Sequence, residues 1–95
     1  MSEVSIRLDK WLWHARFFKS RTRSSALCEA GRVRVGGRIV AKAHHTIKVG
    51  DVLTFPQGNR IRVVRVSAIA PRRVSAPQAA ALYEDMSPAM PGRAA

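Results

Sequence analysis

The sequence predicts an α+β fold in which a helical hairpin packs on a small antiparallel sheet. Three observations support this prediction. Apolar residues recur at helical spacing near the N-terminus, the period changes to two from Arg32 onward, and short apolar runs after that point are separated by glycine-containing turns. The chain has 95 residues and a mass of 10.5 kDa, which leaves room for a single domain.

The first helix is expected over Asp9–Phe18. Leu8, Leu12 and Ala15 fall on one side of it at spacings of four and three residues, which is typical of a helix that buries one face. Asp9 suits the N-cap or the first turn, where a negative charge opposes the helix dipole.

A second helix is expected over Arg23–Ala30, with Ser20 or Thr22 as its N-cap and Gly31 as its stop. The connector between the two helices is short, so they should form a tight hairpin. The inner face of the second helix is expected to hold Ala26, Leu27 and Ala30.

The next residues alternate between basic and apolar side chains, which is typical of a half-buried strand. Strands are expected over Arg32–Val35 and Arg38–Val40, joined by a turn at Gly36-Gly37. Further strands are expected over Val52–Phe55 and Arg60–Ile69. The residues of the last strand that should point inward are Ile61, Val63 and Val66.

The composition changes near residue 71 and suggests three segments. Residues 1–6 are expected to be a leader, residues 7–70 the folded domain, and residues 71–95 an extension rich in Pro and Ala. Four of the five prolines lie from Pro71 onward. A short helix that begins near Ser75 or Pro77 is expected within this extension.

The charge of the chain points to a polyanionic partner. Seventeen Lys and Arg oppose six Asp and Glu, for a formal net charge of +11. Sixteen of these basic residues lie between Arg7 and Arg73, so the charge belongs to the folded part and not to a tail. Such an excess repels itself in a compact fold, and a nucleic acid would compensate it. A face that only keeps the protein soluble is the alternative.

The basic residues are expected to converge where the helical hairpin meets the first strands. The N-terminus of the second helix would add free N–H groups there for a phosphate. The residues expected on this surface are Arg16, Lys19, Arg21, Arg23, Arg32, Arg34, Arg38 and Lys42.

Two aromatic residues of the first helix leave two interpretations open. Trp13 and Phe17 lie on the side opposite the apolar face. They could stack on unpaired RNA bases, or they could pack beneath the last strand or the C-terminal segment.

Neither a metal site, a cofactor nor catalysis is expected. His14, His44 and His45 show no metal-ligand spacing with Cys28, and no motif places a base beside a nucleophile. A single cysteine excludes an internal disulfide and favours a reducing compartment. The sequence shows neither a secretory signal nor an apolar run long enough for a membrane span, so a cytoplasmic protein without membrane contact is expected.

Four motifs, in this order and spacing, resemble a known family. They are Arg7–Leu12, Arg16–Arg21, Gly31–Gly37 and Val49–Asp51. The chain resembles the RNA-binding domain named after the fourth protein of the small ribosomal subunit. Within that superfamily it is most similar to the ribosome-associated fifteen-kilodalton heat-shock proteins. The resemblance implies the alpha-L RNA-binding motif, formed by the two helices and the first strand hairpin.

The resemblance also implies partners and contact residues. The partners would be ribosomal RNA of large subunits, together with the peptidyl-tRNA that carries a nascent chain, and the role would be recycling of these subunits under stress. Some members carry a long basic C-terminal extension, which is replaced here by a short and nearly neutral one. A monomer is expected. The RNA contacts carried over are Arg7, Lys10, Arg16, Lys19, Ser20, Arg21, Arg32 and Arg34.

Two other functions remain open from the sequence. One is a general RNA- and DNA-binding module without ribosome specificity. The other is an accessory subunit of an RNA-modifying enzyme, because this domain is often fused to catalytic domains that 95 residues cannot include.

Overall fold

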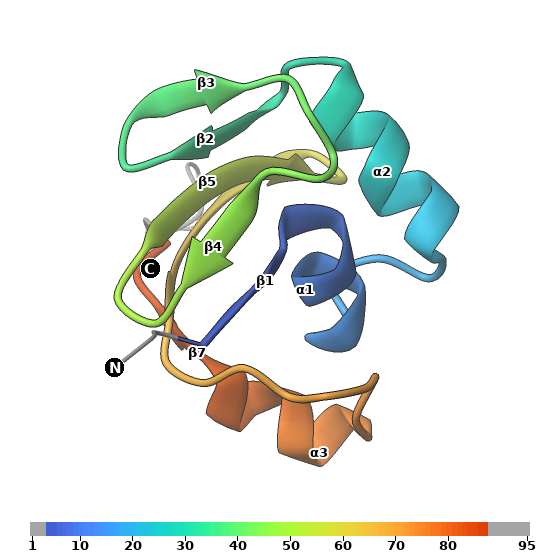
Figure 1. The fold of residues 1–95 in the computed structure, drawn as a ribbon, viewed down its shortest axis with the longest axis vertical. Coiled ribbons are helices and arrows are strands. Elements are labelled where there is room, and N and C mark those ends of the chain that lie inside the picture. The colour runs from blue at the N-terminus through green and yellow to red at the C-terminus, as the bar shows by residue number, and fades with distance from the viewer. Residues whose placement is uncertain (1–3, 88–95) are drawn as a thin grey trace, which may run out of the picture.

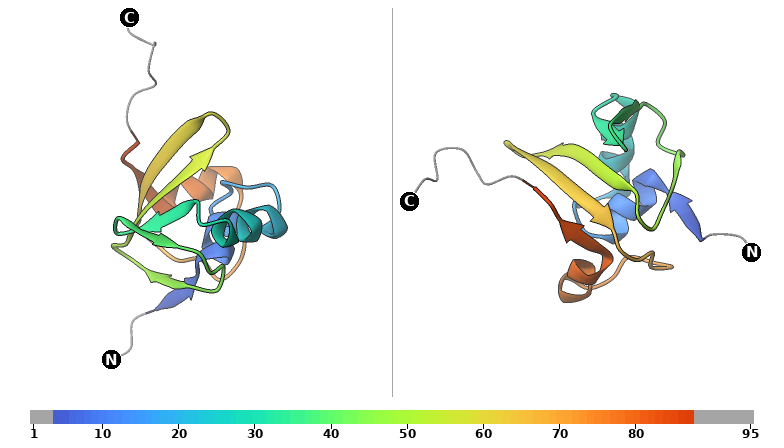
Figure 2. Two further views of the ribbon diagram at one scale, coloured as in Figure 1. Left: turned by 90° about the horizontal axis from the view of Figure 1, so that it is seen from above. Right: turned by 90° about the vertical axis from the view of Figure 1, so that its left-hand side faces the viewer.

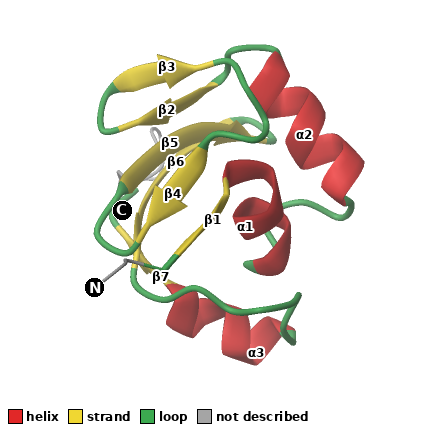
Figure 3. Ribbon diagram, viewed as in Figure 1, coloured by secondary structure: helices red, strands yellow, loops and turns green. Residues whose placement is uncertain are grey.

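In the computed structural model, which describes residues 4–87, a helical hairpin lies beside two antiparallel sheets (Figure 1). One sheet has five strands in the order β3-β2-β5-β6-β7, and the other pairs β1 with β4. Figure 3 shows α1 and α2 together on one side of the strands. The predicted α+β class is therefore confirmed. In chain order the elements are β1 Ser5–Arg7, α1 Leu8–His14, α2 Arg21–Glu29, β2 Val33–Val35, β3 Arg38–Val40, β4 Thr46–Lys48, β5 Val52–Gln57, β6 Arg60–Val66, α3 Ala76–Ala79, the 3-10 helix η1 Ala80–Leu82 and β7 Tyr83–Asp85.

Helix α1 ends well before the position predicted from the sequence. Arg16 has a φ of 65°, in the left-handed region that a non-glycine residue seldom adopts. Its N–H donates to the carbonyl of Trp13 at 3.0 Å, and the N–H of Phe17 donates to the carbonyl of Leu12 at 3.1 Å. These two bonds form a Schellman motif, which closes the helix and turns the chain sharply. The predicted helical spacing between Trp13 and Phe17 is therefore wrong.

Two local signals in the sequence are confirmed. The Ser20 hydroxyl caps α2, because its oxygen accepts a hydrogen bond from the N–H of Arg23 at 3.1 Å. Gly36 and Gly37 both have positive φ, 59° and 85°, in the turn between β2 and β3. Both features depend on neighbouring residues only, which is why the sequence predicts them well.

The predicted inner face of α2 is wrong for Ala26 and Ala30, which are exposed, and correct for Leu27, which is half-buried and packs against the core. Ser24 and Cys28 are fully buried, whereas Ala26 is exposed. The Ser24 hydroxyl donates to the backbone carbonyl of Asp9 on α1 at 2.6 Å. A buried hydroxyl is stable when it has such a partner, so a small polar residue lies where an apolar one was expected.

The N-terminal residues belong to the fold. Ser5 pairs with Lys48 and Ile6 with Ile47, which makes β1 and β4 a two-stranded sheet. The leader expected over residues 1–6 therefore differs from the structure at Ser5 and Ile6. The partner strand β4 lies in residues 41–48, where no strand was predicted, and the sequence did not reveal its pairing with β1.

The C-terminal segment continues the main sheet. Strand β7 pairs with β6 from Val64↔Asp85 to Val66↔Tyr83, and Figure 2 shows the two strands side by side. Leu82, at the end of η1, is 6% exposed and joins the core. The short helix expected after Ser75 is present as α3. The described part of the expected extension thus packs against the domain.

The inward residues of strand β6 differ in part from the predicted ones. Its pairing with β5 runs without a bulge from Val52↔Arg65 to Gln57↔Arg60. Val64 is fully buried while Ile61 is 53% exposed, so of the predicted inward residues only Val66 is fully buried. Because strand side chains alternate, a shift of one residue exchanges the two faces.

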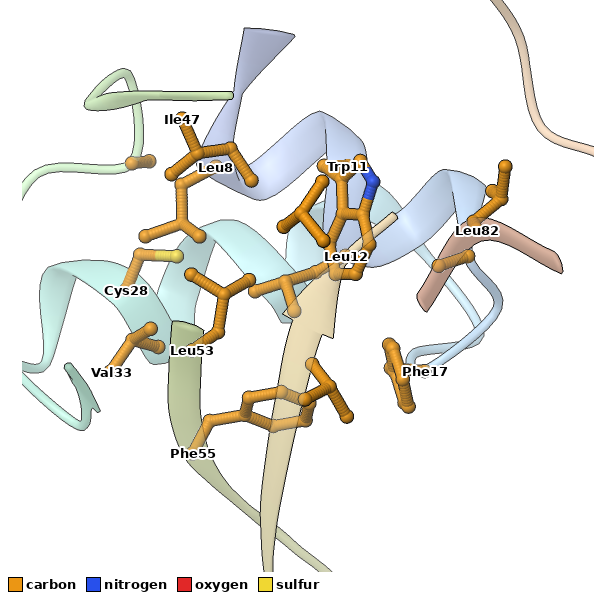
Figure 4. Close-up of a cluster of buried hydrophobic side chains, with 14 of the residues drawn as sticks. Leu8, Trp11, Leu12, Phe17, Cys28, Val33, Ile47, Leu53, Phe55 and Leu82 are labelled. Carbon is orange, nitrogen blue, oxygen red and sulfur yellow. The ribbon is translucent and has the colours of Figure 1, made fainter. Parts of the chain in front are cut away.

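The core lies between α1 and the inner face of the main sheet (Figure 4). Trp11 and Leu12 are fully buried, and Figure 4 shows them above Leu53 and Phe55 of β5. The Trp11 indole donates to the carbonyl of Ala68 at 3.1 Å, which fixes the chain after β6 beside α1.

Phe17 belongs to this core. Its ring centroid lies 5.1 Å from that of Phe55 and 4.7 Å from that of Tyr83. The packing interpretation is therefore correct for Phe17. Trp13 is half-buried beneath Arg73, whose guanidinium carbon lies 5.4 Å from the centre of a Trp13 ring.

A buried histidine makes the stability of this fold depend on pH. His14 is 3% exposed, and its Nδ1 lies 3.2 Å from the carbonyl oxygen of Ala70. Burial lowers its pKa below the ordinary 6.5, and the nearby charges of Lys10, Arg21 and Arg73 lower it further, against the opposing effect of the hydrogen bond.

We expect the free energy of unfolding to fall as the pH drops below about 6.5, because the unfolded chain then takes up a proton at His14 that the folded chain does not. Above that pH the contribution is fully present. Urea unfolding between about pH 7 and pH 5 should show a flatter profile for His14→Gln, which can hydrogen-bond without titrating. If the free energy of unfolding depends on pH equally in both proteins, the pH dependence does not come from His14.

Candidate nucleic-acid interface

The C-terminal strand neutralises part of the positive charge. Arg62 on β6 forms an ion pair with Asp85 on β7 at 3.2 Å, and Arg65 pairs with Glu84 at 3.0 Å. Two of the six acids of the chain are thus placed beside the cations of β6. This edge of the main sheet is therefore less positive than the composition suggests.

Most cations of the helical hairpin and of the β2–β3 hairpin have no such partner within residues 4–87. Eight of the predicted contact residues have no acidic group within 4.0 Å among residues 4–87, and all except the half-buried Lys10 are exposed. An exposed surface of this kind attracts phosphate groups. The eight are Lys10, Arg16, Lys19, Arg23, Arg32, Arg34, Arg38 and Lys42.

Three of these cations share one groove. Lys19 from the helix connector, Arg23 from α2 and Arg32 before β2 line a groove of about 610 Å³. Gln57 and Gly58, at the turn between β5 and β6, close its other side. The sequence missed this wall, since nothing local shows that a turn about 40 residues away reaches the connector.

Two predicted contacts are held by a buried carboxylate. Asp9 is 1% exposed and accepts from Arg7 through Nε at 3.1 Å and Nη2 at 3.0 Å. The Nε of Arg21 lies 3.6 Å from the same carboxylate. Such a buried charge needs both partners. Arg7 and Arg21 therefore have a structural role, and their free N–H groups border a pocket of about 410 Å³ on the other side of α2.

The β2–β3 hairpin holds a separate group of cations. Arg38 and Lys42 line a third groove of about 430 Å³ together with His45. Arg34 is exposed on β2, opposite Ile39 on β3 and Thr54 on β5. The structure thus distributes the predicted residues over several neighbouring elements, and none of these three grooves contains them all.

The start of α2 offers further donors. The oxygen of Ser20 accepts from Arg23, while its hydroxyl hydrogen remains available to a phosphate. The N–H groups of Arg21 and Thr22 have no backbone acceptor among the described residues. Cations and N–H groups therefore occur together at this helix end.

Arg16 and Arg73 connect the end of α1 to the segment after β6. Arg16 Nη1 donates to the Val74 carbonyl at 3.0 Å. Arg73 donates to the carbonyl of Trp13 at 3.1 Å and to that of Phe18 at 3.2 Å, close to the negative end of the α1 dipole. The sequence missed Arg73 because it contacts residues that lie about 55 to 60 positions earlier.

Within residues 4–87 there is no group of three or more His, Cys, Asp or Glu side chains that could hold a metal ion. In the same part of the chain, no helix has the length and apolar character needed to cross a membrane. Burial raises the pKa of the Cys28 thiol to about 12, so the thiol stays protonated and is a poor nucleophile.

Comparison with known proteins identifies the class. Residues 6–53 match the S4 domain family. The chain is 39% identical over 85 residues to a heat shock protein 15 homolog of Haemophilus influenzae, covering 90% of this chain and 64% of that protein. It is 38% identical over 79 residues to the RQC P-site tRNA stabilizing factor of Halalkalibacterium halodurans, covering 83% of this chain and 88% of that protein.

A solved structure agrees with these similarities. Heat shock protein 15 of Vibrio cholerae, described as trimeric, matches with a TM-score of 0.81 and 35% identity over 86% of this chain and 82% of that one. The chain therefore belongs to the heat shock protein 15 family of S4-domain proteins, as its motifs predicted. It spans less than two thirds of the Haemophilus relative.

Arg16 allows backbone strain and charge to be tested separately. Both Arg16→Gly and Arg16→Ala lose the guanidinium, but glycine adopts the left-handed conformation without strain. We expect Arg16→Gly to be more stable than Arg16→Ala by about 1 kcal/mol in urea unfolding. If Arg16 contacts RNA, both variants should bind more weakly by the same factor. If Arg16→Ala instead binds RNA more weakly than Arg16→Gly, in line with its lower stability, the role of Arg16 is purely structural.

Proposed function

We propose that this chain is a non-catalytic RNA-binding protein that uses the surface of α1, α2 and the β2–β3 hairpin. The observation that carries the proposal is the set of eight exposed or half-exposed cations without acidic partners in the described structure. The proposed RNA contacts are those predicted from the sequence, namely these eight cations together with Arg7, Ser20 and Arg21. Residues 7–70 supply this surface. Phosphate contacts of this kind provide most of the affinity for RNA.

The target is ribosomal RNA on large subunits that carry a nascent chain on tRNA, and binding aids the recycling of those subunits. Family membership supports this choice. The Halalkalibacterium relative is named for stabilising P-site tRNA, and this chain covers 88% of it. The matched region therefore corresponds to most of that relative.

The protein acts in the cytoplasm, where its target is found. We expect the free chain to be a monomer, although the Vibrio relative is described as a trimer. The formal net charge of +11 makes copies of the chain repel one another. Bound RNA would neutralise this charge. The oligomeric state of the RNA-bound chain therefore does not follow from that of the free chain.

Co-sedimentation tests the target. Purified protein is mixed with small subunits, large subunits, or large subunits bearing peptidyl-tRNA, and each mixture is centrifuged through sucrose at low and moderate salt. We expect selective migration with the third species. Equal, salt-sensitive binding to all three, with equal displacement by duplex DNA, would instead indicate a general nucleic-acid-binding module. Migration with none would contradict the ribosomal proposal.

The electrostatic part of the proposal predicts the salt dependence of binding. Contacts to about four to six phosphates give a slope of log K against log salt of about −3 to −5. Arg34→Ala should reduce that slope by about one unit, because it removes an exposed cation without an ion pair.

Arg65→Ala is the matched control. It removes the same charge from a strand of the same sheet, but from a cation already paired with Glu84. We expect its slope to stay close to that of the unmodified protein. Equal losses in both variants would show that net charge, and not this surface, determines the affinity.

A further inference from the structure

We propose that the groove between α2 and the β5–β6 turn holds one unstacked nucleotide of the bound RNA. The apolar lining receives the base, and the surrounding cations hold the phosphates on either side of it. This inference rests on the proposed RNA binding and adds to it a preference for RNA in which a nucleotide is unpaired.

The groove has the size and the lining that a base requires. Its volume is about 610 Å³, within the range of roughly 300–1,000 Å³ found for small-ligand sites. Phe18 and Leu27 are half-buried in its wall, and the exposed Ala26 and Ala30 leave the side along α2 open. Aromatic and aliphatic surfaces of this kind stack on or cover the faces of unpaired bases.

The charge of the groove selects a nucleotide over an apolar peptide. Lys19, Arg23 and Arg32 line it, are exposed, and have no ion-pair partner among residues 4–87. No Asp or Glu is among its lining residues. An apolar surface bordered by three uncompensated cations fits a ligand with a flat apolar body and flanking negative charges.

The neighbouring pocket on the other side of α2 lacks this character. It contains Asp9 and Glu29 beside Arg7 and Arg21, so its charges are balanced. Phosphate would meet repulsion there as well as attraction. The two sides of α2 therefore differ, and only the one with Lys19 combines apolar walls with uncompensated cations.

The groove has little means of distinguishing one base from another. Its only side-chain amide, Gln57, donates through Nε2 to the Phe17 carbonyl at 2.7 Å and accepts from Arg62 at 2.8 Å. Both ends of this amide are thus engaged within the protein. Recognition by stacking tolerates any base, so we infer selection of an unpaired nucleotide and not of a sequence.

The test compares two RNAs and two variants. One RNA is a short perfect duplex, and the other is the same duplex with a single bulged nucleotide. In Ala26→Leu/Ala30→Leu, two leucines fill the groove without changing charge, at an exposed position on α2 and at its exposed C-cap. The control is Ala76→Leu, an exposed position on α3, which lies away from the groove at the far end of the molecule (Figure 1). Thermal unfolding verifies that each variant is folded.

We expect the unmodified protein and Ala76→Leu to bind the bulged RNA about tenfold more tightly than the perfect duplex, which is within the range that base stacking provides. The double variant should lose this preference and bind the two RNAs with equal affinity. Equal affinity of the unmodified protein for both RNAs would overturn the inference and leave RNA binding intact. Failure to bind either RNA or large subunits would overturn the proposed function itself.

A second measurement locates the base. With 5-iodouridine as the bulged nucleotide, irradiation should crosslink the RNA to the peptide that contains Phe18, and the double variant should abolish this crosslink. A crosslink to another segment at the same yield in both proteins would overturn the placement in the groove. If the preference persists in the double variant, the unpaired nucleotide lies elsewhere and the inference is wrong.

Discussion

Asp9 connects the elements that carry the basic surface. Its N–H donates to the Ala43 carbonyl at 3.2 Å, its carbonyl accepts from Ser24, and its carboxylate holds Arg7 and Arg21. One buried residue thus links β1, both helices and the loop before β4. A buried carboxylate that lost its arginine partners would destabilise the fold.

The arrangement of the sheet gives the protein two electrically different sides. Strand β7 brings Glu84 and Asp85 to β6, where they pair with Arg65 and Arg62. The C-terminal segment therefore contributes more than packing, because it neutralises one edge and leaves the helical hairpin as the positive region. Charge segregation of this kind orients an approaching polyanion, since the field is strongest where cations lack partners.

Membership of the S4-domain family accounts for the helical hairpin and the first strands, and the proposed nucleotide site extends beyond them. The family match ends at residue 53, whereas Gln57 and Gly58 form one wall of the groove. Gln57 also binds the carbonyl of Phe17, the residue that follows the left-handed turn at Arg16. Closure of the groove thus depends on how the later strands pack against the connector.

The sequence by itself determined the features that depend on near neighbours. The α+β order, the Ser20 cap and the glycine turn at residues 36–37 follow from interactions within a few positions. Only the tertiary structure decided the end of α1, the buried face of α2 and the inward face of β6. It also decided the pairing of β1 with β4 and the arginine partners of Asp9. Each of these features depends on which distant segment covers a given surface. Long-range packing supplies the free energy that decides this, and a local sequence pattern contains no information about it.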